Sequence, residues 1–575
     1  MKKFFTLFFT FLSIFSISAQ SQASDSSIPG NADFWSDYPD DALADFLMSR
    51  MSDEEKLSQI FMFGWAGEEP SVLLNQWVGE RGLGSVKVFG WNTNNTEKVA
   101  KSVTALQELS QNRPLKIPLF VATDQEGGWI RHVKGATTET PGNMAIGASQ
   151  YPMDSYYSAY YISLEIKALG INMNFAPTID LYTNKDSSVI SSRSFGEDAD
   201  FVGQLGSAFV AGSIAAGVIP TAKHFPGHGD TSADSHVKLP GVYIDYETAE
   251  KRELVPFKYL ISQNVPAIMS GHLLYPRIDG DPASLSRPWL NDILREKLGF
   301  KGLIITDDMQ MNGAWGYAGN TSEAFRRAIY AGNDIILSSR TAELDEKLWT
   351  LNLYLIKTDS DFRKIVETAA HRVILYKLKY FKSGNAAPLY PEISRLKEQI
   401  PNKDGHKFFL SQACRSITAY KKGTFPYKKA DGEKLLIVGP ADSVSKENPE
   451  IRLESQFFDE AKIRYGEFAA YKINFDSLGP VGIDWNGNQL EYMAGSYDTI
   501  IFYVPNKEGA EIAKRLSKCG KRVIIMSALT PVPLLNGFDF ADSILFGYSY
   551  SPFTFKALFG ALAGEFEPEG KLPLN

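Results

Sequence analysis

Cysteine is nearly absent from this chain, which has two cysteines, Cys414 and Cys519, in 575 residues. Two cysteines cannot form the dense disulfide framework of a small secreted domain, and neither lies in a pattern typical of a metal site. They could pair with each other or stay as buried thiols, and we favour buried thiols because free cysteine is among the most buried residue types. Stability must therefore come from hydrophobic cores, for which 44% apolar residues are ample.

Runs of basic residues are also missing. The formal net charge is -8, with 59 Lys and Arg against 67 Asp and Glu, so we expect no nucleic-acid partner. A long apolar run occurs at the start, where Lys2 and Lys3 precede it and small residues follow at 21–23. This pattern predicts a secretory signal peptide over 1–23 and export to the periplasm or the cell exterior. The run is too short and too rich in Ser and Thr for a membrane span.

Eight short apolar runs within residues 40–340 predict a barrel. Most are bounded by Gly, Pro or Asn, and helix-like spans such as 155–169 and 287–298 separate several of them. Near-continuous apolar strands that alternate with helices imply a parallel sheet buried on both faces, and eight of them fit a (β/α)₈ TIM barrel. An open doubly wound sheet stays possible, although no glycine-rich fingerprint follows the first run. The runs are Gln59–Phe63, Ser85–Phe89, Pro118–Thr123, Ile171–Ala176, Val218–Ala222, Ala267–Ser270, Leu303–Thr306 and Asp334–Leu337.

A second α/β pattern follows the barrel. The stretch 383–391, SGNAAPLYP, is typical of a linker, and strand-like runs resume in the last third of the chain. We therefore expect an α/β protein in which a signal peptide (1–23) precedes the barrel (24–382), a linker (383–405) and a smaller α/β sandwich domain (406–575). The later runs are Leu435–Val438, Thr499–Val504, Arg522–Met526 and Ser543–Phe546, with an amphipathic helix at Ala510–Lys518.

Polar residues stand at the ends of four of the barrel runs. Active sites of TIM barrels lie at the carboxyl ends of the strands, so these residues are expected to share one pocket. Five of the seven histidines lie just past such ends, which supports the same pocket. The residues at the strand ends are Asp124, Lys223, His224, His272, Asp307 and Asp308.

The densest group of titratable residues is the stretch 223–240, KHFPGHGDTSADSHVKLP. Its Asp234-Ser235-His236 triplet places a carboxylate beside an imidazole, which can orient the ring and stabilise its protonated form. The histidines and Asp234 are also ligand types that zinc accepts. However, Phe-Pro-Gly prevents a helix from aligning His224 with His228, and Lys223 would repel a cation, so we expect no metal and no cofactor.

Several separated motifs resemble the β-N-acetylglucosaminidases of glycoside hydrolase family 3, and the match covers nearly all of the mature protein. The resemblance implies a retaining enzyme in which Asp307 attacks the anomeric carbon and His236 serves as general acid and base, with Asp234 as its partner. Most retaining glycosidases use two carboxylates, but histidine can exchange a proton near neutral pH. The motifs are Asp124–Gly128 (DQEGG), Asn174–Pro177, Arg193–Phe195, Lys223–Gly229 with Asp234–His236, and Ile305–Asp308.

The resemblance also implies that Asp124, Arg193, Lys223 and His224 hold the hydroxyl groups of the sugar. Arg193 could instead, or in addition, form a salt bridge with Asp124 or Glu126. In the family a further arginine stands where this chain has His132, so the neighbouring Arg131 is a candidate for the same binding role.

The expected partner is a carbohydrate that carries terminal N-acetylglucosamine, such as peptidoglycan fragments or chitin oligomers, and we expect a monomer. Two alternatives stay open: a family 3 enzyme of the β-glucosidase type, and a glycan-binding protein without activity. The β-glucosidases as a class take their acid/base carboxylate from the second domain, so a barrel histidine at 236 favours N-acetylglucosamine. The combined presence of Asp234, His236 and Asp307 favours an enzyme.

Overall fold

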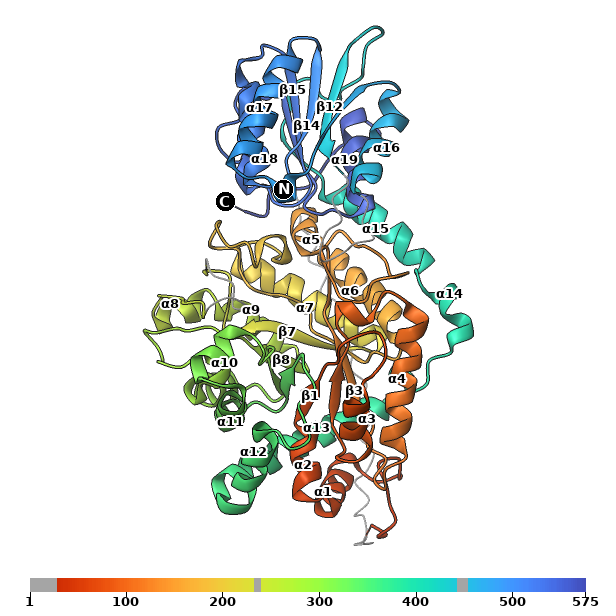
Figure 1. The fold of residues 1–575 in the computed structure, drawn as a ribbon, viewed down its shortest axis with the longest axis vertical. Coiled ribbons are helices and arrows are strands. Elements are labelled where there is room, and N and C mark those ends of the chain that lie inside the picture. The colour runs from red at the N-terminus through yellow and green to blue at the C-terminus, as the bar shows by residue number, and fades with distance from the viewer. Residues whose placement is uncertain (1–27, 232–238, 442–452, 575) are drawn as a thin grey trace, which may run out of the picture.

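The computed structural model describes residues 28–231, 239–441 and 453–574, which form a barrel and a smaller domain above it (Figure 1). The predicted signal peptide lies outside these residues. Within them, no helix is long and apolar enough to span a membrane. Cys414 and Cys519 are both half-buried free thiols.

The first sheet has eight parallel strands in the order β10–β1–β2–β3–β6–β7–β8–β9, and every residue in them is buried. A parallel bridge between Ile305 and Ile335 joins β9 to β10 and closes the sheet. Each of the eight predicted runs overlaps one strand, so the predicted TIM barrel is confirmed. The strands are β1 (Phe61–Phe63), β2 (Ser85–Lys87), β3 (Phe120–Thr123), β6 (Met173–Asn174), β7 (Ile219–Phe225), β8 (Ala267–Ser270), β9 (Leu303–Thr306) and β10 (Ile336–Ser338).

Helices surround this sheet and begin and end at residues that suit those positions. For example, the Asp198 side chain accepts a hydrogen bond from the Phe201 N–H (2.8 Å) at the start of α7, and Gly217 ends that helix with φ 87°. The helices are α1 (Asp40–Arg50), α2 (Asp53–Gln59), α3 (Val72–Gly79), α4 (Thr96–Gln111), α5 (Asn143–Ser149), α6 (Pro152–Lys167), α7 (Ala199–Ala216), α8 (Tyr246–Lys251), α9 (Leu254–Ser262), the π-helix η4 (Pro288–Lys297), α10 (Asn312–Ala318), α11 (Thr321–Ala331), α12 (Lys347–Thr358) and α13 (Ser360–Phe381). The segment beyond α13 holds α14 (Leu396–Gln399) and the start of α15 (Lys403–Ser416).

The second domain contains a six-stranded sheet in the order β11–β16–β15–β14–β12–β13, in which only β11 is antiparallel. Helices α17 and α18 lie on one side of it and α16 and α19 on the other (Figure 1). The strands are β11 (Thr418–Lys421), β12 (Leu435–Pro440), β13 (Ala469–Ile473), β14 (Thr499–Tyr503), β15 (Arg522–Ser527) and β16 (Ser543–Phe546). The helices are α16 (Leu453–Tyr465), α17 (Pro480–Ala494), α18 (Lys507–Lys514) and α19 (Pro552–Ala563).

Helix α5 of the barrel lies at the junction with the second domain (Figure 1). All seven of its residues are buried, and Met144, Ala145 and Ala148 belong to the hydrophobic core of the second domain. An ion pair accompanies this apolar contact: Arg415 of α15 pairs with the buried Asp154 of α6 at 2.5 Å. The barrel thus contributes side chains to the hydrophobic core of the second domain.

We expect Gly147→Ala, in the middle of α5, to destabilise the protein although alanine is the better helix former. A β-carbon at this position would lie 1.8 Å from the backbone oxygen of Phe195 and 3.3 Å from Pro573, so neighbouring backbone would have to move. The cost should be about 2 kcal/mol in the free energy of unfolding, measured by chemical denaturation. Gly79→Ala is the control, since its nearest neighbour would be Leu109 at 3.6 Å. Equal effects of the two changes would contradict this account of the junction.

Candidate active site

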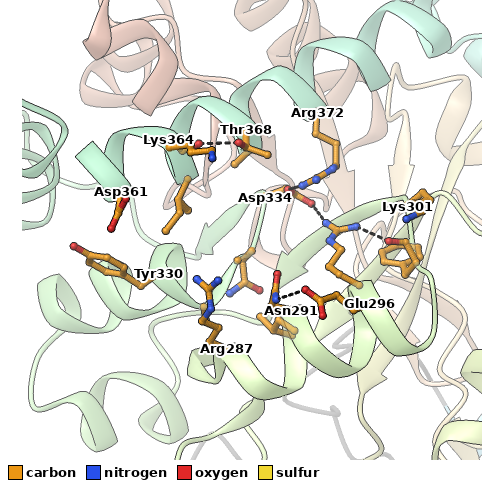
Figure 2. A pocket seen from close by; sticks show the side chains of 18 residues that line it. Arg287, Asn291, Glu296, Lys301, Tyr330, Asp334, Asp361, Lys364, Thr368 and Arg372 are labelled. Atoms are coloured by element: carbon orange, nitrogen blue, oxygen red, sulfur yellow. Dashed lines mark hydrogen bonds and ion pairs between the residues drawn. The ribbon is translucent and has the colours of Figure 1, made fainter. Parts of the chain in front are cut away.

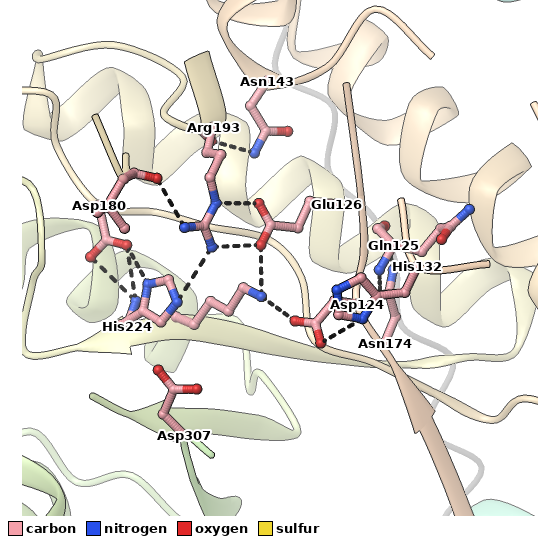
Figure 3. Close-up of polar contacts among 12 residues, drawn as sticks. Asp124, Gln125, Glu126, His132, Asn143, Asn174, Asp180, Arg193, His224 and Asp307 are labelled. Atoms are coloured by element: carbon pink, nitrogen blue, oxygen red, sulfur yellow. Dashed lines mark hydrogen bonds and ion pairs between the residues drawn. The ribbon is translucent and has the colours of Figure 1, made fainter. Parts of the chain in front are cut away.

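Most of the predicted site residues meet at the carboxyl ends of the barrel strands (Figure 3). Asp124 follows β3, Lys223 and His224 belong to the end of β7, and Asp307 follows β9. Arg193 comes from a short helical turn at Ser191–Arg193, and its side chain reaches the same cluster. Residues far apart in the sequence are therefore brought together where a barrel builds its site.

Asp124 is held between two lysines. Its carboxylate oxygens lie 2.5 Å from the Lys223 ammonium and 2.6 Å from the ammonium of Lys87, which ends β2. Burial would raise the pKa of Asp124, but Lys223, Lys87 and His132 hold that pKa well below its usual range. The carboxylate is thus ionised and can accept hydrogen bonds from hydroxyl groups.

Glu126 forms the second half of the same network (Figure 3). It accepts two hydrogen bonds from the Arg193 guanidinium, at 3.0 Å and 2.7 Å, and lies 2.7 Å from the Lys223 ammonium. Burial opposes ionisation, but Arg193 and Lys223 lower the pKa of Glu126 to about 2. The salt bridge weighed for Arg193 from the sequence is therefore present, and its acceptor is Glu126.

His224 is oriented by Asp180, a buried residue that follows β6. The His224 Nδ1 lies 2.6 Å from an Asp180 carboxylate oxygen, while Nε2 lies 3.5 Å from the Arg193 guanidinium. The same carboxylate accepts the backbone N–H of His228 at 2.6 Å. Burial would raise the pKa of Asp180, but the neighbouring His224 lowers it. Asp180 thus fixes both the ring and the backbone of the loop after β7.

Asp307 stands apart from this network, on its own strand (Figure 3). Its backbone N–H donates to the Ser270 oxygen (2.9 Å), and its carboxylate accepts the N–H of Asp308 (2.8 Å). Burial would raise its pKa, but His224, His272 and the Asp308 N–H lower it to about 2. An ionised carboxylate with few protein partners is suited to act as a nucleophile.

The side chains of Arg131 and His132 contact different residues. The Arg131 guanidinium donates to the oxygens of Thr137 at 3.0 Å and pairs with Glu139 at 3.2 Å. The His132 Nδ1 lies 3.5 Å from the Asp124 carboxylate, and burial lowers the pKa of His132 to about 4. The side chain next to Asp124 is therefore His132, the residue at the position of the family arginine, while Arg131 contacts the segment after it.

Asp234 and His236, the expected acid/base pair, lie outside the described residues. The loop that leads to them is described up to Thr231. Among the described residues, no group of His, Cys, Asp or Glu has the arrangement of a metal site.

Two residues of the site, Lys87 and Asp180, were not predicted from the sequence. Lys87 ends the second apolar run, so the rule that placed Asp124 at a strand end applies to it as well. Asp180 comes six residues after the end of β6, in a loop where spacing alone gives little guidance.

A large cavity of about 780 Å³ lies elsewhere, beside α13 and η4 (Figure 2). Its central carboxylate, Asp334, precedes β10 and therefore marks the amino ends of the strands. Asp334 is already paired with Arg295 and Arg372. Active sites of TIM barrels lie at the opposite, carboxyl ends of the strands, so we do not assign the active site to this cavity.

The model of the glycosyl hydrolase family 3 N-terminal domain matches residues 52–374, more than half of the chain. The chain belongs to glycosyl hydrolase family 3. It is therefore a glycoside hydrolase, and the resemblance inferred from the motifs is confirmed.

Relatives of similar sequence bear the name β-hexosaminidase. Over 281 residues the chain is 36% identical to β-hexosaminidase A of Pseudoalteromonas piscicida, covering 46% of this chain and 47% of that protein. The chain thus spans about half the length of that relative. It is 34% identical to a β-hexosaminidase of Nitrosomonas eutropha, covering 47% of this chain and 77% of that one.

Solved structures extend the similarity to the second domain. A family 3 β-N-acetylglucosaminidase from Paenibacillus sp. str. FPU-7 has a TM-score of 0.82 and 28% identity, covering 91% of this chain and 99% of that one. A β-glucosidase from Listeria innocua has a TM-score of 0.72, covering 92% of this chain and 76% of that one, but at 18% identity it shows the fold alone.

Glu253 lies against the loop that follows β7. A β-carbon on Gly227 would lie 2.8 Å from a Glu253 carboxylate oxygen. Arg252 donates to Glu253 at 2.6 Å and pairs with Asp230 of the loop at 3.1 Å. Burial raises the pKa of Glu253 to about 7, although Arg252 opposes the rise. The loop thus rests on a carboxyl group that titrates near neutral pH.

We expect Glu253→Gln to change how stability depends on pH. The pKa of Glu253 rises from 4.5 to about 7 on folding. In that window the folded state binds more protons than the unfolded state, so this group makes stability fall as pH rises. The glutamine variant lacks this loss. Its free energy of unfolding should therefore exceed that of the wild type at the upper end of the pH window, by at most on the order of 3 kcal/mol. The measurement is the free energy of unfolding at both ends of the window, with the exposed Glu247→Gln as control. A constant difference between Glu253→Gln and the wild type would contradict the assignment.

Proposed function

We propose that this protein is a retaining β-N-acetylglucosaminidase that removes terminal β-linked N-acetylglucosamine. The observation that carries the proposal is the ionised Asp307 at the end of β9, facing a buried network of charged hydrogen-bonding groups. The β-hexosaminidase names of the relatives support the sugar specificity.

In the first step, Asp307 attacks the anomeric carbon and forms a glycosyl-enzyme intermediate. The departing oxygen takes a proton from His236, whose protonated ring Asp234 stabilises. In the second step, neutral His236 removes a proton from water, which attacks the same carbon and releases Asp307. A low pKa suits Asp307 to both steps, because it must be ionised before attack and is a better leaving group afterwards.

The buried network of charged residues binds the hydroxyl groups of the sugar. Asp124 and Glu126 are acceptors, Lys223 and Arg193 are donors, and the His224 ring adds a further polar group; charged groups make the stronger hydrogen bonds to hydroxyl groups. Arg131 is proposed as a further binding residue that acts through the segment at Thr137–Glu139. We propose peptidoglycan fragments or chitin oligomers as the glycan, with the protein exported and acting as a monomer.

Specificity is tested by comparing the 4-nitrophenyl β-glycosides of N-acetylglucosamine and glucose. We expect kcat/KM to be at least about 100-fold higher for N-acetylglucosamine, because a site that bonds the acetamido group rejects a sugar without it. The Asp307→Ala variant serves as the control for contaminating activity and should lose about four orders of magnitude. Faster release from glucose would assign the protein to the β-glucosidase type. No release from either sugar would support a glycan-binding protein.

The acid/base role is tested with His236→Ala. We expect kcat/KM to fall by about 10²- to 10⁴-fold on a disaccharide, whose sugar leaving group needs a proton. The loss on a 4-nitrophenyl glycoside should be far smaller, since that leaving group departs as an anion. Equal losses on both substrates would mean that His236 has a structural role only.

A further inference from the structure

Two neighbouring cavities near the amino ends of the barrel strands form one groove along α13. The cavity of Figure 2 and a second one of about 720 Å³ are both lined by Lys301, Lys364 and Arg372. The residues of α13 that line them extend from Asp361 to Lys379, which is about 27 Å of helix. The two cavities together are called the basic groove below. The basic groove is separate from the active site, which lies at the opposite ends of the strands.

The charge of the basic groove differs in sign from that of the whole chain. Seven Lys and Arg residues line it against four Asp and Glu, whereas the chain carries 59 and 67. The seven come from α2, from η4 and the residue before it, from the turn before β9 and from α13. The fold thus gathers cations that form no basic run in the sequence. They are Lys56, Arg287, Arg295, Lys301, Lys364, Arg372 and Lys379.

Two of the four carboxylates in the groove are neutralised by cations of the groove itself. The buried Asp334 pairs with two arginines, Arg295 at 2.5 Å and Arg372, so this group of three keeps one positive charge. Glu367 pairs with Lys56 at 2.8 Å. These pairs hold the walls of the groove together without removing its excess of positive charge.

The other four cations are exposed and have no ion pair within the part of the chain that the structure describes. They are Arg287, Lys301, Lys364 and Lys379. Figure 2 shows Arg287 and Lys364 on opposite sides of the cavity. An anion between them would meet uncompensated positive charge from both walls, and a cleft lined by one sign of charge concentrates the electrostatic potential.

The wall that η4 forms has a rare geometry. Its turns are π-helical, and the Leu298 N–H donates to the Ile293 oxygen five residues earlier (2.8 Å). Such turns are uncommon and occur frequently at functional sites. Here they place Asn291 and Arg295 on the groove side together with Arg287. This geometry is a second indication, independent of the charge, that the groove binds a ligand.

We propose that the basic groove binds a linear polysaccharide that carries carboxylate groups. Its length suits an extended chain, and guanidinium groups match planar carboxylates. The cations Lys364, Arg372 and Lys379 follow one another at about 10 to 12 Å along α13. Duplex DNA, with one charge per about 1.7 Å, is far more densely charged, and the acidic residues of the groove would repel it. The proposal does not depend on which sugar the active site removes.

The test is electrophoresis of the whole protein in native gels that contain polygalacturonate, with amylose as the neutral polymer. We expect polygalacturonate to retard the wild type, with less retardation at higher salt, and amylose to have no effect. A variant that combines Lys301→Gln, Lys364→Gln and Lys379→Gln should bind polygalacturonate about tenfold more weakly, because three exposed ion pairs with the polymer are lost.

The matched control combines Lys101→Gln, Lys428→Gln and Lys518→Gln. These lysines are also exposed and lie outside the groove, so the net charge changes equally and binding should stay as in the wild type. Both variants should keep the wild-type rate on the 4-nitrophenyl glycoside of N-acetylglucosamine, which shows that they are folded. Equal weakening in both variants, or no retardation of the wild type, would overturn the proposal. Tighter binding of duplex DNA than of polygalacturonate would overturn the choice of a polysaccharide.

Discussion

The site depends on the pairing of five charges that are buried or nearly so. The carboxylates of Asp124 and Glu126 pair with three cations at the carboxyl ends of the barrel strands, where water is largely excluded; these cations are Lys87, Lys223 and Arg193. Any one of these charges alone would be costly to bury, and removing one partner would leave another uncompensated. Because the set is complete, the groups hold fixed positions before a substrate arrives. A sugar then meets preorganised donors and acceptors and replaces water at their remaining hydrogen-bonding positions.

The low pKa of Asp307 depends in part on the same group of residues, although Asp307 does not belong to their network of ion pairs. Cationic and imidazole groups nearby keep its pKa low, yet the hydrogen bonds to its carboxylate come from the backbone beside it. The network can therefore tune the nucleophile and bind the sugar while leaving the attacking oxygen accessible.

Much of the fold follows from sequence patterns because the barrel strands are apolar along their whole length. The strands β11 and β13 were missed, since both lie at the edges of the second sheet and expose alternate residues, so neither forms a continuous apolar run. In the site, strand ends predicted Asp124, Lys223 and Asp307, because a parallel barrel brings such ends together. The partner of His224 could not be predicted in that way, because Asp180 reaches it through an irregular loop after β6.

Helix α5 has a consequence for how the molecule loses its structure. Its apolar side chains complete the core of the second domain, although they belong to the barrel. Opening of the second domain would therefore expose hydrophobic surface of the barrel at α5, which couples the stabilities of the two parts at this junction. The domain boundary drawn along the sequence does not coincide with the edge of the second hydrophobic core.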